Sequence, residues 1–216
     1  HMLYNYCTLD LSAFYLDAYD IDAKFLYRAC LQRRSAQTAI HITVDSIAKL
    51  MAPILSFTAE EIWQHMPEEK GKKTSIHLSS FPVVNNAWKD QNLAKNWECL
   101  LDVRTRVTKA LEDARAEKLI GHPLDASVTI YAPEDLYETL YPYSEKLSSI
   151  FIVSNARLVK EDNPEAESKG EDIEKLRVVV EQATGGKCER CWKHDNSTGT
   201  DPGHPTICSR CRENIK

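Results

Sequence analysis

Two Cys-x-x-Cys pairs near the end of the chain constrain its fold more than any other feature. Cys188 and Cys191 form the first pair, Cys208 and Cys211 form the second, and sixteen residues separate the pairs. A two-residue gap lets both thiolates of a tight turn face a single ion, and a second turn then completes a tetrahedron. The spacing predicts one structural Zn²⁺ ion held by four cysteines. Four sulfur ligands leave no open position for a reacting water.

The same segment leaves two alternatives to a four-cysteine zinc site. The four thiols can instead form two disulfides, although paired turns at this separation match zinc sites better. His194 and His204 lie between the pairs as rival ligands, but four sulfurs already fill the site. The chain has seven cysteines, an odd number, and no secretory signal. These features indicate a reducing compartment, the cytoplasm.

Composition narrows the possible partners. The 216 residues are 43% apolar, which suffices for one large or two small domains. No apolar run approaches the length of a membrane span, so no membrane partner is expected. The formal net charge of −5 argues against a protein that coats nucleic acid through bulk charge. Any nucleic acid is therefore expected to bind through a local patch.

Helical periodicity dominates the first half of the chain. Thr58 to Glu61 resembles a capping box that opens a short helix, and Gly121 is the expected left-handed stop of the longest helix. The second predicted helix runs until Pro53, and a short extended segment is expected over Ser75 to Ser79. The predicted helices span residues 5–17, about 34–52, 58–66 and about 92–120.

A mixed pattern of strands and helices follows Gly121. Pro133 is expected at the first position of a helix that Pro142 shortens. Residues 161–174 contain seven acids and predict an exposed connector. Predicted extended segments span residues 126–131, 150–153, 156–159 and 177–182.

The expected fold class is mainly α with a small α/β unit. We predict a helical domain over residues 3–121, an α/β subdomain with its acidic connector over 122–183, and a four-cysteine zinc ribbon over 184–216. Residues 3–6 have the character of a helix interior without a preceding cap. This predicts a piece of a longer protein, truncated at the start of its helical domain.

Several segments together resemble the carboxy-terminal part of bacterial-type isoleucyl-tRNA synthetases. The most specific is Ala52-Pro53-Ile54-Leu55-Ser56-Phe57-Thr58-Ala59-Glu60-Glu61-Ile62-Trp63, which related valyl and leucyl enzymes share. Ala110 to Gly121 and the cysteine-rich tail with Trp192 narrow the resemblance to the isoleucyl form. The resemblance departs at Asp22 to Tyr27, where the family usually carries a different turn. The other similar segments are Leu11 to Asp17 and Arg33 to Thr38.

The resemblance implies a function for the parent enzyme and a smaller one for this chain. The parent would be an ATP-dependent isoleucine-tRNA ligase, but its His-x-Gly-His and Lys-Met-Ser-Lys-Ser signatures are absent here. ATP and Mg²⁺ would therefore bind in a catalytic domain outside this chain. The chain itself would be the anticodon-binding part, without a catalytic centre. Its implied partners are isoleucine tRNA and the parent's catalytic and editing domains, with no DNA, in a monomer.

Eight residues are candidate tRNA contacts. Trp192 can stack on an unpaired base or instead pack the ribbon. Arg33 and Arg34 can reach the RNA backbone or begin a solvated helix. Basic residues of the long helix are balanced by acids, so a solvated face is the alternative for them. The full set is Trp192, Arg190, Arg210, Arg212, Arg33, Arg34, Arg104 and Lys118.

Three rival classes share some of these features. A zinc-ribbon transcription factor would normally show a basic surface. A zinc hydrolase would need an open ligand position, which four cysteines do not leave. A zinc-stabilised protein-interaction module or inter-domain clamp, without RNA binding of its own, is the main alternative, because zinc ribbons often dock on other domains.

Overall fold

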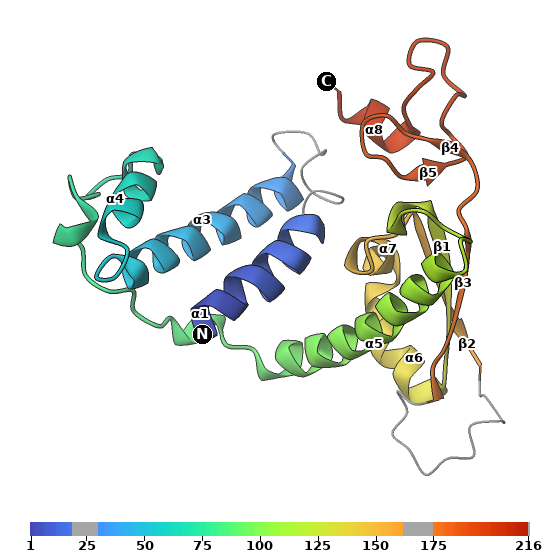
Figure 1. Cartoon of the computed structure of the whole chain (residues 1–216), viewed down its shortest axis with the longest axis horizontal. Helices are drawn as coiled ribbons and strands as arrows, with labels where there is room; N and C mark the ends of the chain where they lie inside the picture. Colours follow the sequence, from blue (N-terminus) through green and yellow to red (C-terminus); the bar gives the residue numbers. More distant parts are fainter. Residues whose placement is uncertain (19–29, 162–174, 216) are drawn as a thin grey trace. The chain divides into compact units, whose positions relative to one another are not determined.

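The computed structural model describes residues 1–18, 30–161 and 175–215 and divides the chain into two compact units. The sheet unit contains His1–Tyr27 and Gln91–Lys216, and the helical unit contains Arg28–Asp90. Figure 1 labels the elements of both. Among the described helices, none is both long enough and apolar enough to cross a membrane. The predicted segments at 22–27 and 162–174 lie outside the described residues.

The helical unit is built on two helices, α3 (Leu31–Met51) and α4 (Ser56–His65). The predicted helix that ends near Pro53 is confirmed, although it begins three residues earlier. A small core of Ala48, Ala52, Ala59, Trp63 and Ile76 holds the pair together. Trp63 is only 5% exposed and belongs to this core. The short 3₁₀ turns η2 (Ile76–Leu78) and η3 (Asn86–Trp88) complete this unit.

Two local predictions in the helical unit are wrong. The helix α4 begins at Ser56 with Leu55 as its N-cap, so Thr58 lies inside the first turn and forms no capping box. The segment around Ser75 is not extended but forms η2. The reason is a contact from α4, because the Glu60 carboxylate accepts hydrogen bonds from Ser75 Oγ (2.8 Å) and the Ile76 amide (3.0 Å).

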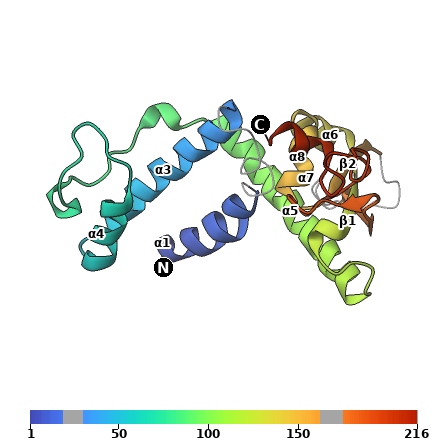
Figure 2. The same cartoon turned by 90° about the horizontal axis from the view of Figure 1, so that it is seen from above.

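The sheet unit begins with α1 (Met2–Asn5) and the π-helical η1 (Tyr6–Leu16), which Figure 2 shows as one continuous rod. The predicted helix over residues 5–17 is therefore confirmed as helical. No residue of this rod is buried. It is held through Phe14, which meets Trp97 edge-on at 6.2 Å and lies under the Arg104 guanidinium at 4.7 Å.

The long helix α5 (Gln91–Ala116) buries one apolar stripe, formed by Leu100, Val103, Val107, Leu111 and Ala114. It ends earlier than predicted, and Gly121 is not its stop. Lys118 takes the left-handed conformation instead, with φ 61°. The amides of Lys118 and Leu119 donate to the carbonyls of Arg115 (3.0 Å) and Ala114 (2.9 Å). This is a Schellman motif with lysine where glycine is usual.

A three-stranded sheet carries the main core, and α5 lies against it (Figure 1). The strand β1 (Ala126–Ala132) pairs in parallel with β2 (Asn155–Lys160) and antiparallel with β3 (Arg177–Gln182). Its residues alternate between buried and half-buried, as the alternation in the sequence predicts. The core between sheet and helices includes Val128, Ile130 and Leu140.

The predicted strand over residues 150–153 is wrong. This apolar run is the end of α7 (Leu147–Ile150) and the turn after it, and the strand beside β1 is β2. Before it come α6 (Glu134–Leu140) and the 3₁₀ segment η5 (Tyr141–Lys146), so Pro142 does shorten the helix. Pro133 is the N-cap of α6 rather than its first residue.

The end of the chain is a small ribbon. It contains the short strands β4 (Gly186–Lys187) and β5 (His194–Asp195), which pair antiparallel, and the helix α8 (Ser209–Glu213). The predicted fold class, mainly α with a small α/β unit and a ribbon at the end, is confirmed.

Candidate metal centre

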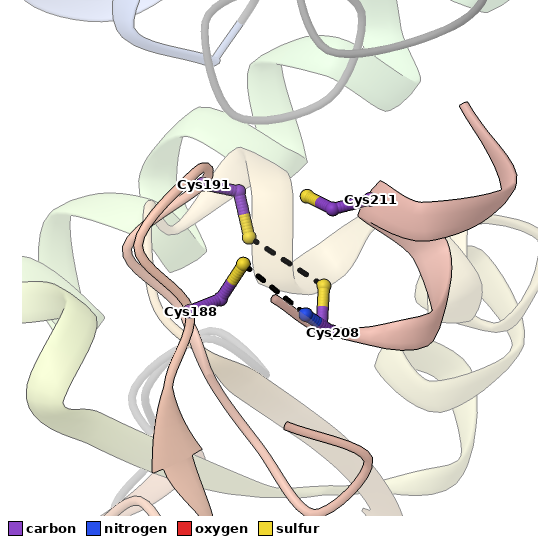
Figure 3. Close-up of side chains that lie close together, drawn as sticks. All are labelled: Cys188, Cys191, Cys208 and Cys211. Atoms are coloured by element: carbon purple, nitrogen blue, oxygen red, sulfur yellow. Dashed lines mark hydrogen bonds between the residues drawn. The ribbon is translucent and has the colours of Figure 1, made fainter. Parts of the chain in front are cut away.

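The two cysteine pairs meet inside the ribbon (Figure 3). Cys188 and Cys191 flank the turn between β4 and β5, and Cys208 and Cys211 lie at the start of α8. All four are at most 5% exposed, and their sulfur atoms lie within 4.8 Å of one another. In the described part of the chain, this is the group of four that could hold a metal ion.

The sulfur spacing fits a tetrahedral zinc ion. A Zn–S bond of about 2.3 Å places two ligand sulfurs about 3.8 Å apart at the edge of a tetrahedron. Cys191 Sγ and Cys208 Sγ are separated by 3.8 Å. The Cys208 amide also donates to Cys188 Sγ at 3.3 Å, a contact that stabilises a thiolate. All seven cysteines are free, so the alternative of two disulfides is not adopted.

Hydrogen bonds and burial shift the pKa values of three of these cysteines in opposite directions. Hydrogen bonds from Cys211, Cys188 and Cys208, together with the Lys193 amide, outweigh burial and lower the pKa of Cys191 to about 5. Burial raises the pKa of Cys208 to about 11, and the Cys191 thiolate and burial raise the pKa of Cys211 as well. A cation entering this centre would displace the protons of Cys208 and Cys211.

Neither rival histidine belongs to this group. His194 Nε2 lies 3.4 Å from Asp125 Oδ1, and its Nδ1 lies 3.2 Å from the Gly185 carbonyl. Burial alone would raise the pKa of Asp125, but the His122 amide, Lys187 and His194 together lower it. His194 therefore joins the ribbon to the residues before β1, the 3₁₀ turn η4 (Pro123–Asp125).

A buried serine fastens the ribbon to the sheet. Ser154 Oγ donates to the Leu124 carbonyl (2.5 Å) and accepts from the His194 amide (2.7 Å), and this residue is 6% exposed. One hydroxyl therefore satisfies two backbone groups from different parts of the chain.

We expect Ser154→Ala to lower the free energy of unfolding by about 1 to 3 kcal/mol, because it leaves the Leu124 carbonyl and the His194 amide without this partner. Hydrogen exchange at the His194 amide should accelerate. Thr139→Ala is the control, since it removes an exposed hydroxyl that bonds the Asp135 carbonyl at 3.0 Å. An unchanged exchange rate at His194 would show that Ser154 does not hold the ribbon.

Gly185 permits the close approach of the two ribbon strands. Its φ is 91°, and a Cβ added there would lie 2.4 Å from the carbonyl carbon of Asp195. Gly199 has nearly the same φ, 90°, but its added Cβ would meet no atom closer than Pro205 O at 3.9 Å.

The two glycines form a matched pair of tests. Gly199→Ala is expected to cost about 1 to 2 kcal/mol for its left-handed backbone alone. Gly185→Ala adds a backbone clash and is expected to cost about 2 to 5 kcal/mol in total. Chemical denaturation measures both, and equal effects would contradict the close approach at Gly185.

A hollow of about 700 Å³ opens beside the first cysteine pair. Its walls come from η1, α5, the turn after α7 and the residues around Cys191. Small-molecule sites have volumes of about 300 to 1,000 Å³, so the hollow is large enough for a ligand. Its lining residues include Arg104, Arg115, His122, Ile152, Arg190 and Trp192.

Comparison with known proteins assigns the chain to a family. Residues 1–130 match the model of a family described as "Anticodon-binding domain of tRNA ligase". The chain belongs to the anticodon-binding domain family of tRNA ligases. Residues 185–214 match a second model, "Zinc finger found in FPG and IleRS", which covers all four clustered cysteines. Together with the cluster's geometry, this match supports a structural zinc ion in this anticodon-binding chain.

The similar proteins are isoleucine–tRNA ligases, as the resemblance in the sequence predicts. The chain is 44% identical to that of Geobacter sulfurreducens and 42% identical to that of Caldanaerobacter subterraneus subsp. tengcongensis, over its whole length in both cases. It is 43% identical to that of Syntrophotalea carbinolica over 98% of its length. The anticodon-binding chain spans 23% of the first two relatives and 22% of the third.

Three of the eight candidate RNA contacts line the hollow of this anticodon-binding chain, namely Trp192, Arg190 and Arg104. Arg190 also donates to the Cys211 carbonyl at 3.3 Å. Arg104 is engaged within the fold, because it donates to the carbonyls of Ile150 (3.2 Å) and Ala13 (3.4 Å). Burial lowers the pKa of the Arg104 guanidinium, and the negative charge of Asp17 partly offsets this decrease. Arg104 therefore fixes η1 on α5 as well as lining the hollow.

The other five candidates are not among the residues that line the hollow. Lys118 is exposed at the end of α5. Arg210 and Arg212 lie on α8, where Arg212 forms an ion pair of 2.9 Å with Asp201. Arg33 and Arg34 lie in the first turns of α3, in the helical unit. RNA contacts by these residues stay predictions.

Sequence reasoning missed several residues of the hollow, including Glu112, Arg115, His122 and Ile152. No local motif marks them, because they come from a helix, a 3₁₀ turn and the end of α7. The left-handed backbone at Trp192, with φ 63°, was also not predictable from composition. Glycine after the second cysteine would have indicated that turn.

Proposed function

We propose that this chain recognises isoleucine tRNA through its anticodon loop, as part of an ATP-dependent isoleucine–tRNA ligase. The ligase reaction, with ATP and Mg²⁺, belongs to a catalytic domain outside this chain, and the chain contributes no catalytic centre. We further propose that a single Zn²⁺ ion is bound by Cys188, Cys191, Cys208 and Cys211. The parent works as a monomer in the cytoplasm, in contact with its own catalytic and editing domains.

One observation carries the proposal. Trp192 has a left-handed backbone, with φ 63°, is 61% exposed as a residue, and lines the hollow. In this turn the Trp192 amide donates to the Cys188 carbonyl at 2.8 Å. Glycine would adopt the same backbone conformation without strain. A large exposed aromatic side chain at a strained position supports a function rather than a packing role. Unpaired bases stack on such aromatic surfaces.

The zinc ion has a positioning role in this account. When bound, it stabilises the turn on which Trp192 and Arg190 lie. The hydrogen bonds through Ser154 then hold that turn against the sheet. Residues that sit on rigid, connected elements lose little freedom on binding RNA, which favours affinity.

We retain the functional division into residues 3–121, 122–183 and 184–216 as a proposal. The inter-domain clamp is the second candidate, because the ribbon docks on the sheet through Ser154, Asp125 and Lys193. A clamp explains this docking but gives no reason for the exposed indole of Trp192.

The test is the affinity of the zinc-loaded chain for isoleucine tRNA, compared with the same tRNA carrying a swapped anticodon, at one fixed salt concentration. We expect the native anticodon to be bound about ten- to hundredfold more tightly, because stacking of one base contributes about 1 to 3 kcal/mol. Binding should also weaken steeply with salt. Equal or absent binding would favour the clamp.

A further inference from the structure

Ile152 has a backbone conformation that isoleucine normally avoids. Its φ is 60°, in the left-handed region, where a β-branched residue is a clear outlier. It ends α7 in a Schellman motif, because its amide donates to Ser149 O (3.2 Å) and the next amide, of Val153, donates to Ser148 O (2.9 Å). Glycine is the usual residue at this position.

Core packing does not account for an isoleucine here. Its neighbours Ile150, Phe151 and Val153 are all buried in the main core. Ile152 is only half-buried, and among the described residues it is not one of the apolar side chains that pack against that core. The strain is therefore not offset by packing against the main core.

Ile152 lines the hollow beside the first cysteine pair. Trp192 lines the same hollow and has the same anomaly, a left-handed backbone under a large apolar side chain. The two are thus strained apolar residues, forty residues apart in the sequence, that line one cavity. Strain that recurs around one cavity is a sign of function.

The rest of the lining has the chemistry of a base-binding site. A nucleobase has apolar faces and a polar edge. Trp192, Ile152 and Pro123 supply apolar surface, while Glu112, Arg115 and His122 supply polar groups. In the described part of the chain, neither Glu112 nor Arg115 forms a side-chain ion pair within the fold, so both remain available to a ligand.

We infer that Ile152 contacts the same unstacked RNA base that stacks on Trp192, and so helps to determine which base the hollow accepts. This inference rests on the proposed function and adds to it a second, apolar contact from the sheet unit's α7 turn. It makes the hollow a pocket for a single base rather than an open stacking surface.

The test compares Ile152→Gly and Ile152→Val in the zinc-loaded full chain, with a stem-loop RNA that carries the anticodon arm of isoleucine tRNA. Glycine removes the side chain and relieves the backbone, so the thermal midpoint should stay the same or rise. The affinity should nevertheless fall about five- to tenfold, the effect of losing a partly buried isoleucine contact. Valine keeps the branched apolar surface and should restore binding to within about twofold.

A double-mutant cycle with Trp192→Ala tests whether both residues touch one base. We expect the two effects to be non-additive, because the same base provides both contacts. If Trp192→Ala weakens binding while Ile152→Gly binds like the unaltered chain, this inference fails and the proposed function stands. Additive effects of the two substitutions would likewise overturn the shared base. If the unaltered chain does not bind the stem-loop, the proposed function and this inference fail together.

Discussion

Cys208→Ser is expected to release the zinc ion and unfold the ribbon, while the three-stranded sheet stays folded. The ribbon has almost no apolar core of its own, since its buried cluster consists of the four cysteines with Ile207 packed against them. A structural zinc ion contributes on the order of 10 kcal/mol or more to the folding of such a small module. The sheet has a separate core between β1 and the helices, which does not include the four clustered cysteines.

Two measurements check this result. Metal analysis of the purified variant should find well under one zinc per chain, and hydrogen exchange should be fast across residues 185–215 but slow in β1. Cys7→Ser is the matched control, because Cys7 lies on η1, which has no buried residue. A Cys208→Ser chain that kept one tightly bound zinc and a protected ribbon would contradict the four-cysteine site.

The second large effect is expected at Trp192, where stability and RNA binding should move in opposite directions. Trp192→Gly removes a left-handed tryptophan, so the free energy of unfolding should rise by about 1 kcal/mol. The loss of the stacking surface should weaken tRNA binding by about 1 to 3 kcal/mol, or roughly ten- to hundredfold. Zinc content should not change, because the four cysteines remain.

Two further variants separate the causes. Trp192→Phe keeps an aromatic face and should retain most of the affinity. Trp192→Ala loses the face but keeps a side chain in the left-handed turn, so it should bind as weakly as the glycine variant without its gain in stability. If the glycine variant bound tRNA normally, the stacking role would be lost. If it unfolded several kcal/mol more easily, Trp192 would be a packing residue.

The sequence predicted best where one strong physical constraint acts on a local pattern. The strand β1 alternates because one face packs on the core, and β3 matches its predicted bounds at Arg177–Gln182. Residues 150–153 were mispredicted because a short apolar run fits a buried strand and a buried helix end equally well. Only the pairing of β2 with β1 decides between them.

Two helix ends and one turn of the ribbon were harder to predict, for a reason visible at three positions. Lys118, Ile152 and Trp192 all have positive φ, yet none is glycine. We predicted the end of the long helix at Gly121, because glycine adopts a left-handed conformation without strain. The left-handed residue is Lys118, three residues earlier. Turns in which the left-handed residue is not glycine carry no clear signal in the sequence.

The candidate site also has one part that could be predicted from a local pattern and one part that could not. The zinc ligands follow from spacing, because two residues between cysteines fix the geometry of each pair. The hollow could not be predicted, because its walls come from η1, α5, the α7 turn and the first cysteine pair. Arg104 illustrates the difference, since its charge suggested an RNA contact while its hydrogen bonds also tie η1 and the end of α7 to α5.

Photo-crosslinking tests the central claim, recognition of the anticodon loop at this hollow, most directly. Isoleucine tRNA with 4-thiouridine in its anticodon loop is irradiated with the zinc-loaded chain, and the crosslinked peptides are identified by mass spectrometry. Our account predicts crosslinks within residues 151–153 or 189–193. Crosslinks confined to other surfaces, under conditions where the tRNA is bound, would contradict it.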